Sequence, residues 1–122
     1  MPAMDATIDL QQEADYCVVT CAGDLDLHCA DELRRTIGTA IRSGAGTVIV
    51  DLSNAGLVDS TALGVLLSAN TSCNDAGSSL VLVGAGRFVA RSIAVTGLDR
   101  VLTVLPDVAA ARGLALGAGA ED

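Results

Sequence analysis

The stretch TVIVDLSN, residues 47–54, decides the fold, and it is followed closely by VDSTALGVLL, residues 58–67. The first stretch contains an unbroken run of β-branched and aliphatic side chains, which is typical of a strand covered on both faces in a parallel sheet. The second begins at Asp59, a residue type that often precedes a helix, and continues with apolar side chains at helical spacing to about residue 74. Together they predict one strand-then-helix unit, with a strand at residues 47–52, a loop after residue 54 and a helix from Ser60 to about residue 74.

The same alternation continues on both sides of this unit. The other predicted elements are strands at residues 7–10, 16–21, 80–83 and 101–105, a helix at about 29–43 ended by Gly44, a third helix that begins near Phe88 and stops near Gly97, and a final helix opened by Pro106. Repeated strand–helix–strand units imply a largely parallel sheet, and the hairpin at the start adds an antiparallel strand. We therefore expect a single α/β domain over residues 7–112, with a mixed, mostly parallel sheet of about five strands and about four helices. Residues 1–6 and the Gly/Ala-rich residues 113–122 are expected to be flexible.

Composition excludes several classes of function. Hydrophobic residues make up 51% of the chain and charged residues 18%, which argues against disorder. The net charge is -8 and aromatic residues make up only 2%, so nucleic-acid binding is not expected. No charge-free apolar run approaches the ~20 residues of a membrane-spanning helix, and the N-terminus lacks the pattern of a signal peptide. We expect a cytoplasmic protein whose four cysteines are reduced and buried.

The reactive side chains do not favour an enzyme. The single histidine, His28, lies in a polar stretch, and Ser60 is not part of the glycine-flanked elbow of serine hydrolases. Cys17 and Cys21 would share one face of a strand but lie ~13 Å apart, too far for one metal ion. The loop GAGR at residues 84–87 lacks the third glycine of a dinucleotide-binding loop and is expected to be a tight strand-to-helix turn. No catalytic residue, cofactor or metal is therefore predicted.

The polar residues at the start of the second helix are the candidate functional group. Asp59 is expected to cap the helix, which places the Ser60 hydroxyl, exposed, in the first turn beside free backbone N–H groups and the positive end of the helix dipole. An Asp-Ser-Thr sequence at the start of a helix often has no role beyond capping the helix. However, no charged residue occurs in residues 60–74, although a helix on a sheet normally exposes charges on its outer face. The outward positions suit contact with a partner protein; they are expected to be Thr61, Gly64, Val65, Ser68 and Ser72.

Four segments carry a resemblance to a known family. They are GDLD (23–26) followed by ADEL (30–33), VIVDLS (48–53), VDSTALGVL (58–66) and VTGLDRV (95–101). In this order and spacing they resemble the STAS family, the domain of sulfate transporters and of anti-sigma-factor antagonists. The resemblance covers nearly the whole chain, and the short form of the chain is similar to the bacterial anti-sigma-factor antagonists.

The resemblance implies a phosphorylation switch. In such antagonists the serine directly after the motif aspartate, here Ser60, is phosphorylated by the anti-sigma factor, which is itself a serine kinase of the histidine-kinase-like ATPase type. The unphosphorylated form binds this kinase and releases its sigma factor, and a phosphatase of the PP2C type resets the switch. Asp26 matches a family position beside the phosphoacceptor, and Asp59 flanks it. Thr61 offers a second hydroxyl for modification. Ala62 stands where the family commonly has glycine, and its methyl group is expected to alter how closely a kinase approaches.

Other functions stay open at this point. The chain could instead be a STAS subunit that docks on the ATPase of a lipid or solute ABC transport complex, in which Ser60 need not be phosphorylated. An enzyme or a small-ligand sensor is a third class, and no loop in the sequence requires a nucleotide. Self-association also stays open, because a neutral helix face can pair with its own copy.

Overall fold

A five-stranded sheet forms the centre of the structure, a computed structural model that describes residues 5–120. The strands follow one another across the sheet in chain order: β1 (Thr7–Gln12), β2 (Tyr16–Leu25), β3 (Thr47–Val58), β4 (Ser79–Val83) and β5 (Thr103–Leu105). β1 is antiparallel to β2, and every other neighbouring pair is parallel. The predicted mixed, mostly parallel sheet of a single α/β domain is confirmed.

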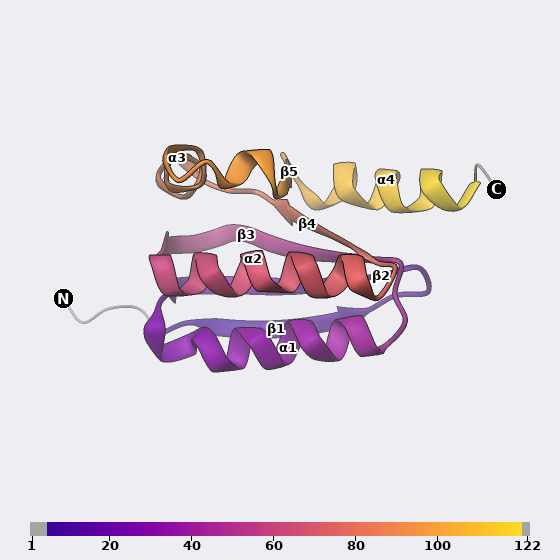
Figure 1. Cartoon of the computed structure of the whole chain (residues 1–122), viewed down its shortest axis with the longest axis horizontal. Helices are drawn as coiled ribbons and strands as arrows, with labels where there is room; N and C mark the ends of the chain where they lie inside the picture. Colours follow the sequence, from indigo (N-terminus) through magenta and orange to yellow (C-terminus); the bar gives the residue numbers. More distant parts are fainter. Residues whose placement is uncertain (1–4, 121–122) are drawn as a thin grey trace.

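Helices cover the two faces of the sheet unequally (Figure 1). They are α1 (Ala30–Arg42), α2 (Ser60–Asp75), α3 (Arg87–Val95) and α4 (Val108–Ala120), with short 3-10 turns η1 (Leu27–Cys29) and η2 (Leu98–Arg100). Buried side chains of α1, α2 and α3 form the larger hydrophobic core with one face of the sheet. A smaller cluster on the other face contains Ala111 of α4. None of the helices in residues 5–120 combines the length and hydrophobicity needed to cross a bilayer.

β3 is covered on both faces, as its apolar run predicted. Val48 and Val50 face the larger core and Ile49 faces the smaller one, and all three are fully buried. The strand is longer than predicted, because it runs on to Val58 where the sequence indicated a loop after residue 54. The polar residues after Leu52 stay in the sheet because strand pairing uses the backbone, and two register shifts in the pairing with β2 accommodate them.

The C-terminal part of the chain differs from the prediction in three places. β5 begins at Thr103 and not at Val101, whose side chain is exposed. Pro106 does not open the last helix: Asp107 accepts a hydrogen bond from the Ala110 N–H (2.8 Å) and takes the capping position, so the proline lies before the cap. The helix runs to Ala120, beyond the domain end expected at residue 112, and the flexibility expected of residues 113–122 stays a prediction. Residues 1–4 and 121–122 lie outside the described residues, so flexibility at those ends stays a prediction.

Candidate functional site

The candidate site lies where β2 and β3 end and the chain turns into helices. Because the two strands are parallel, Leu25 and Val58 pair at their carboxyl ends, and this edge is where open α/β sheets place their sites. The N–H of Asp59 donates to the carbonyl of Leu25 (3.0 Å). This hydrogen bond joins the turn before η1 to the turn before α2, so residues more than thirty positions apart in sequence meet here.

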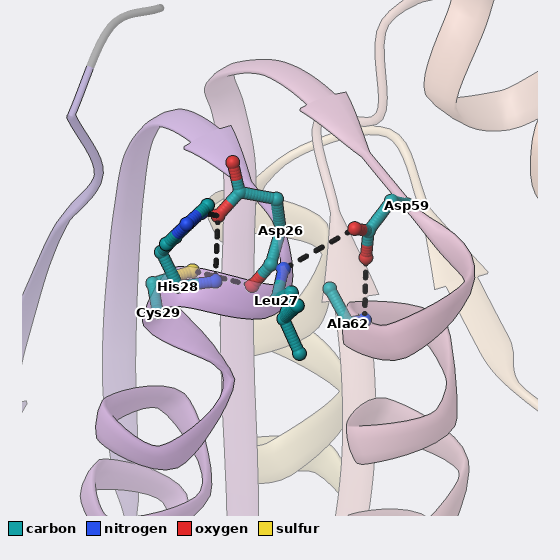
Figure 2. A network of polar contacts seen from close by, with 6 residues as sticks. All are labelled: Asp26, Leu27, His28, Cys29, Asp59 and Ala62. Atoms are coloured by element: carbon teal, nitrogen blue, oxygen red, sulfur yellow. Dashed lines mark hydrogen bonds and ion pairs between the residues drawn. The ribbon is translucent and has the colours of Figure 1, made fainter.

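Asp59 fixes this junction through its side chain (Figure 2). One carboxylate oxygen accepts a hydrogen bond from the N–H of Ala62 at 2.9 Å, which makes Asp59 the predicted N-cap of α2. The other oxygen accepts from the N–H of Leu27 at 3.2 Å. A single carboxylate therefore caps α2 and also holds the chain segment that precedes α1.

Asp26 organises the neighbouring turn. Its carboxylate accepts from the N–H of His28 at 2.9 Å and lies 3.4 Å from the Nδ1 of the same histidine, whose side chain is 91% exposed. The carbonyl of Asp26 accepts from the N–H of Cys29 at 3.1 Å. Figure 2 shows Leu27 between the two aspartates, so the structure brings Asp26 and Asp59 to the same end of the sheet.

Ser60 is the first residue of α2 and is exposed, as predicted. Hydroxyls further along helices often donate to the carbonyl four residues earlier, as Ser92 does to Phe88 and Thr36 does to Glu32. Ser60 has no preceding helical turn, because the residue four positions earlier belongs to β3. Its hydroxyl is therefore free to face solvent or a partner.

The outer face of α2 matches the prediction only in part. Thr61, Gly64 and Ser68 are exposed and neutral, as the sequence predicted, and so is Ser72. Val65, predicted to point outward, is 3% exposed, and Ala62 is fully buried. α1 packs alongside α2, so α2 buries a second stripe of side chains there in addition to the one that faces the sheet.

The burial of Ala62 overturns one interpretation of the sequence. Its methyl group was expected to alter the approach of a kinase, but the side chain lies inside the core and presents no surface. Ala62 takes part in the site through its backbone, since its N–H donates to Asp59. Ala62 and Val65 therefore support the site from within, whereas Thr61, Gly64 and Ser68 form its surface.

A groove beside Ser60 was not predicted. It has a volume of about 670 Å³ and lies between the end of β3, the start of α2 and one side of α3. Three exposed hydrophobic side chains line it, namely Leu57 (48% exposed), Phe88 (77%) and Val95 (78%). Phe88 and Val95 are seven residues apart and so share one face of α3, while Val89 and Ile93 take the buried face. That spacing is the signal that could have revealed an apolar outer face.

The four cysteines are buried, as predicted, and they are free. Burial raises the pKa of Cys21 to about 12, and burial also raises the pKa of Cys29 and of Cys73. A raised pKa keeps these thiols protonated at neutral pH, which suppresses the thiolate that a nucleophile or metal ligand requires. In the part of the chain that the structure describes, no three His, Cys, Asp or Glu side chains are grouped to hold a metal ion.

Comparison with known proteins gives a consistent result. A family model described as the STAS domain matches residues 7–111. An anti-sigma-B factor antagonist of Staphylococcus epidermidis is 27% identical over 101 residues, covering 83% of this chain and 94% of the relative.

Two solved structures illustrate the likeness of the fold. The crystal structure of an anti-sigma factor antagonist from Mycobacterium paratuberculosis has a TM-score of 0.83 at 22% identity, covering 91% of this chain and 94% of that one. The Bacillus cell fate determinant SpoIIAA in its phosphorylated form has a TM-score of 0.69 at 20% identity, covering 88% and 99%.

Proposed function

The chain belongs to the STAS domain family, and within it we propose that the protein is an anti-sigma factor antagonist switched by phosphorylation of Ser60. The names of its curated relatives and of structural neighbours support the antagonist role. A Bacillus protein of the same fold that takes a phosphate supports the switch. In this proposal the protein is a cytoplasmic binding partner and not an enzyme.

The proposed partner is an anti-sigma factor that is also a serine kinase of the histidine-kinase-like ATPase type. The unphosphorylated chain binds this kinase, which then releases its sigma factor. Phosphorylation transfers the γ-phosphoryl group of ATP to the Ser60 oxygen, ADP leaves, and a base on the kinase takes the hydroxyl proton. A PP2C-type phosphatase removes the phosphate and restores binding.

The exposed hydroxyl of Ser60, at a helix start held by Asp59, is the observation that carries this proposal. Phosphate adds a charge of about -1.5 to -2. The fold tolerates that charge, because a helix N-terminus favours an anion by about 0.3–1 kcal/mol. A partner that covers the neutral face of α2 would instead have to desolvate the phosphate beside Asp59 and Asp26. We therefore expect binding to weaken roughly 10- to 100-fold, which corresponds to about 1.4–2.8 kcal/mol.

Thr61 is the competing phosphoacceptor, because it is also exposed in the first turn of α2. Fragmentation mass spectrometry of the chain isolated from its source cells separates the two hydroxyls. The proposal predicts phosphate on Ser60, and it predicts that Ser60→Ala removes the modification whereas Thr61→Val leaves it in place. Phosphate found on Thr61 alone would contradict the assignment of the site.

The experiment that tests the function is affinity purification from the source cells. Wild type, Ser60→Ala, Ser60→Asp and a control, Thr39→Asp, serve as baits, and captured proteins are identified by mass spectrometry. Thr39 is exposed on α1 among charged residues, so Thr39→Asp adds the same charge outside the neutral face of α2. The proposal predicts that all baits except Ser60→Asp capture a small histidine-kinase-like ATPase.

A different capture pattern would favour the transport-complex function. In that case the baits would bring down transporter subunits, including an ATPase of the ABC type, whatever residue stands at position 60. Ser60 would then be only a helix-start residue, and the proposed switch would be wrong.

A further inference from the structure

We propose that Arg91 of α3 is the counter-ion of a phosphate on Ser60, pairing with it across the groove that both residues line. This inference rests on the proposed phosphorylation of Ser60 and adds a second side chain to the switch. It gives α3 a role in the switch, in addition to the role of the first turn of α2. The interaction is that of a phosphomonoester, on Ser60, with the guanidinium group of Arg91.

The groove places the two side chains together. Ser60 lines it from the start of α2, and Arg91 lines it from the facing side of α3. Both residues are exposed, so neither has to leave the core to reach the other. Among the residues that line the groove, Arg91 is the one basic side chain and Asp59 is the one acidic side chain.

The carboxylates around Ser60 disfavour a phosphate dianion there, so a nearby cation would stabilise it. Asp59 directly precedes it, and Asp26 lies at the same end of the sheet. Asp24 is close as well, because a Cβ built on Gly56, which lines the groove, would lie 3.1 Å from its Oδ1. Three carboxylates would therefore repel the phosphate, in a chain whose net charge is -8 and which contains no lysine.

Arg91 is available for this role. The two ion pairs among residues 5–120 join Arg34 to Asp31 and His28 to Asp26, and Arg91 belongs to neither. The guanidinium group presents a planar fork of N–H donors that matches two oxygens of a phosphate. Arg87, one turn earlier on α3, does not line the groove, so it provides a matched comparison on the same helix.

The pairing would increase the change in partner binding that phosphorylation produces. In the unphosphorylated chain Arg91 lines the groove, where it can contact a partner together with Phe88 and Val95. After phosphorylation the arginine is held by the phosphate and is no longer available to that partner. The modification would then add a negative charge and withdraw a positive one from the same surface.

The test measures the pKa of the phosphate directly. Phosphoserine is placed at position 60 during synthesis by genetic encoding, so no kinase is needed, and the phosphorus NMR shift is followed between about pH 4 and 8. The second pKa of phosphoserine is about 6, and a cation beside the phosphate favours the dianion and lowers it. We expect Arg91→Ala to raise this pKa by roughly 0.3–0.5, since an exposed pair is screened.

The control variants decide the outcome. Arg91→Lys keeps the charge and is expected to retain part of the lowered pKa, whereas Arg87→Ala is expected to change it by less than about 0.1. Circular dichroism of each variant confirms that the fold is intact. An unchanged pKa in Arg91→Ala, or an equal change in Arg87→Ala, would overturn the pairing. That result would leave the phosphorylation switch standing, because the affinity purification tests the switch independently.

Discussion

α1 and α2 lie side by side on the same face of the sheet (Figure 1), yet their exposed sides differ in charge. The exposed side of α1 carries Asp31, Glu32, Arg34 and Arg35. The exposed positions of α2 are uncharged up to its last residue, Asp75. Because both helices pack on the same sheet, packing does not explain the difference. A partner that covered α2 would desolvate few charges. Charged residues are scarce at the centre of protein interfaces, so this face resembles such a centre.

The two helices also begin differently. Cys29, at the N-cap of α1, makes no side-chain capping hydrogen bond, and Asp26 instead caps the short turn η1 before it. Asp59 caps α2 and in addition holds the N–H of Leu27. The start of α2 is thus held from two sides while the hydroxyl of Ser60 beside it stays free, as a site of modification requires.

The largest expected effect comes from placing a charge on the neutral face. Ser68→Arg puts a long cation in the middle of the exposed side of α2, and we expect the affinity for the captured partner to fall roughly 10-fold or more. Thr39→Arg is the matched change on α1, where Thr39 is exposed among charged residues, and it should change the affinity less than about 2-fold. Isothermal titration calorimetry measures both. Equal losses in the two variants would remove the distinction between the helices.

The second effect concerns stability. Asp59→Ala removes the cap of α2 and the acceptor of the Leu27 N–H, and we expect it to lower the free energy of unfolding by about 1–2 kcal/mol. Asp59→Asn keeps one side-chain oxygen and should recover most of this loss. Asp26→Ala, which affects only the three-residue η1, should cost about 0.5–1 kcal/mol. Urea unfolding followed by circular dichroism ranks the three variants, and an Asp26→Ala loss as large as that of Asp59→Ala would contradict the ranking.

The smallest effect is expected on the charged face of α1. Arg34 and Asp31 form an exposed ion pair at 2.6 Å, three residues apart on the helix. Such pairs contribute little, so Arg34→Ala should change the free energy of unfolding by less than about 0.5 kcal/mol. The same variant should bind the partner with unchanged affinity. A clear loss of binding would show that the partner also contacts α1.

Sequence reasoning was most accurate where a local pattern decides the structure. The apolar run of β3 and the cap at Asp59 were predicted because strand burial and helix capping depend on a few adjacent residues. The burial of Val65 was missed because it depends on α1, a helix that the periodicity of α2 does not reveal. The groove was missed for the same reason, since Leu57 of β3 and Phe88 of α3 line one groove only after the chain folds.

The account's central claim is that a phosphate on Ser60 changes the interface and leaves the fold intact. The most direct measurement compares the chain carrying phosphoserine at position 60 with the unmodified chain, in affinity for the captured kinase and in melting temperature. We predict a roughly 10- to 100-fold weaker affinity, with melting temperatures that agree within about 2 °C. Equal affinities, or a phosphorylated chain that is unfolded at the assay temperature, would contradict the claim.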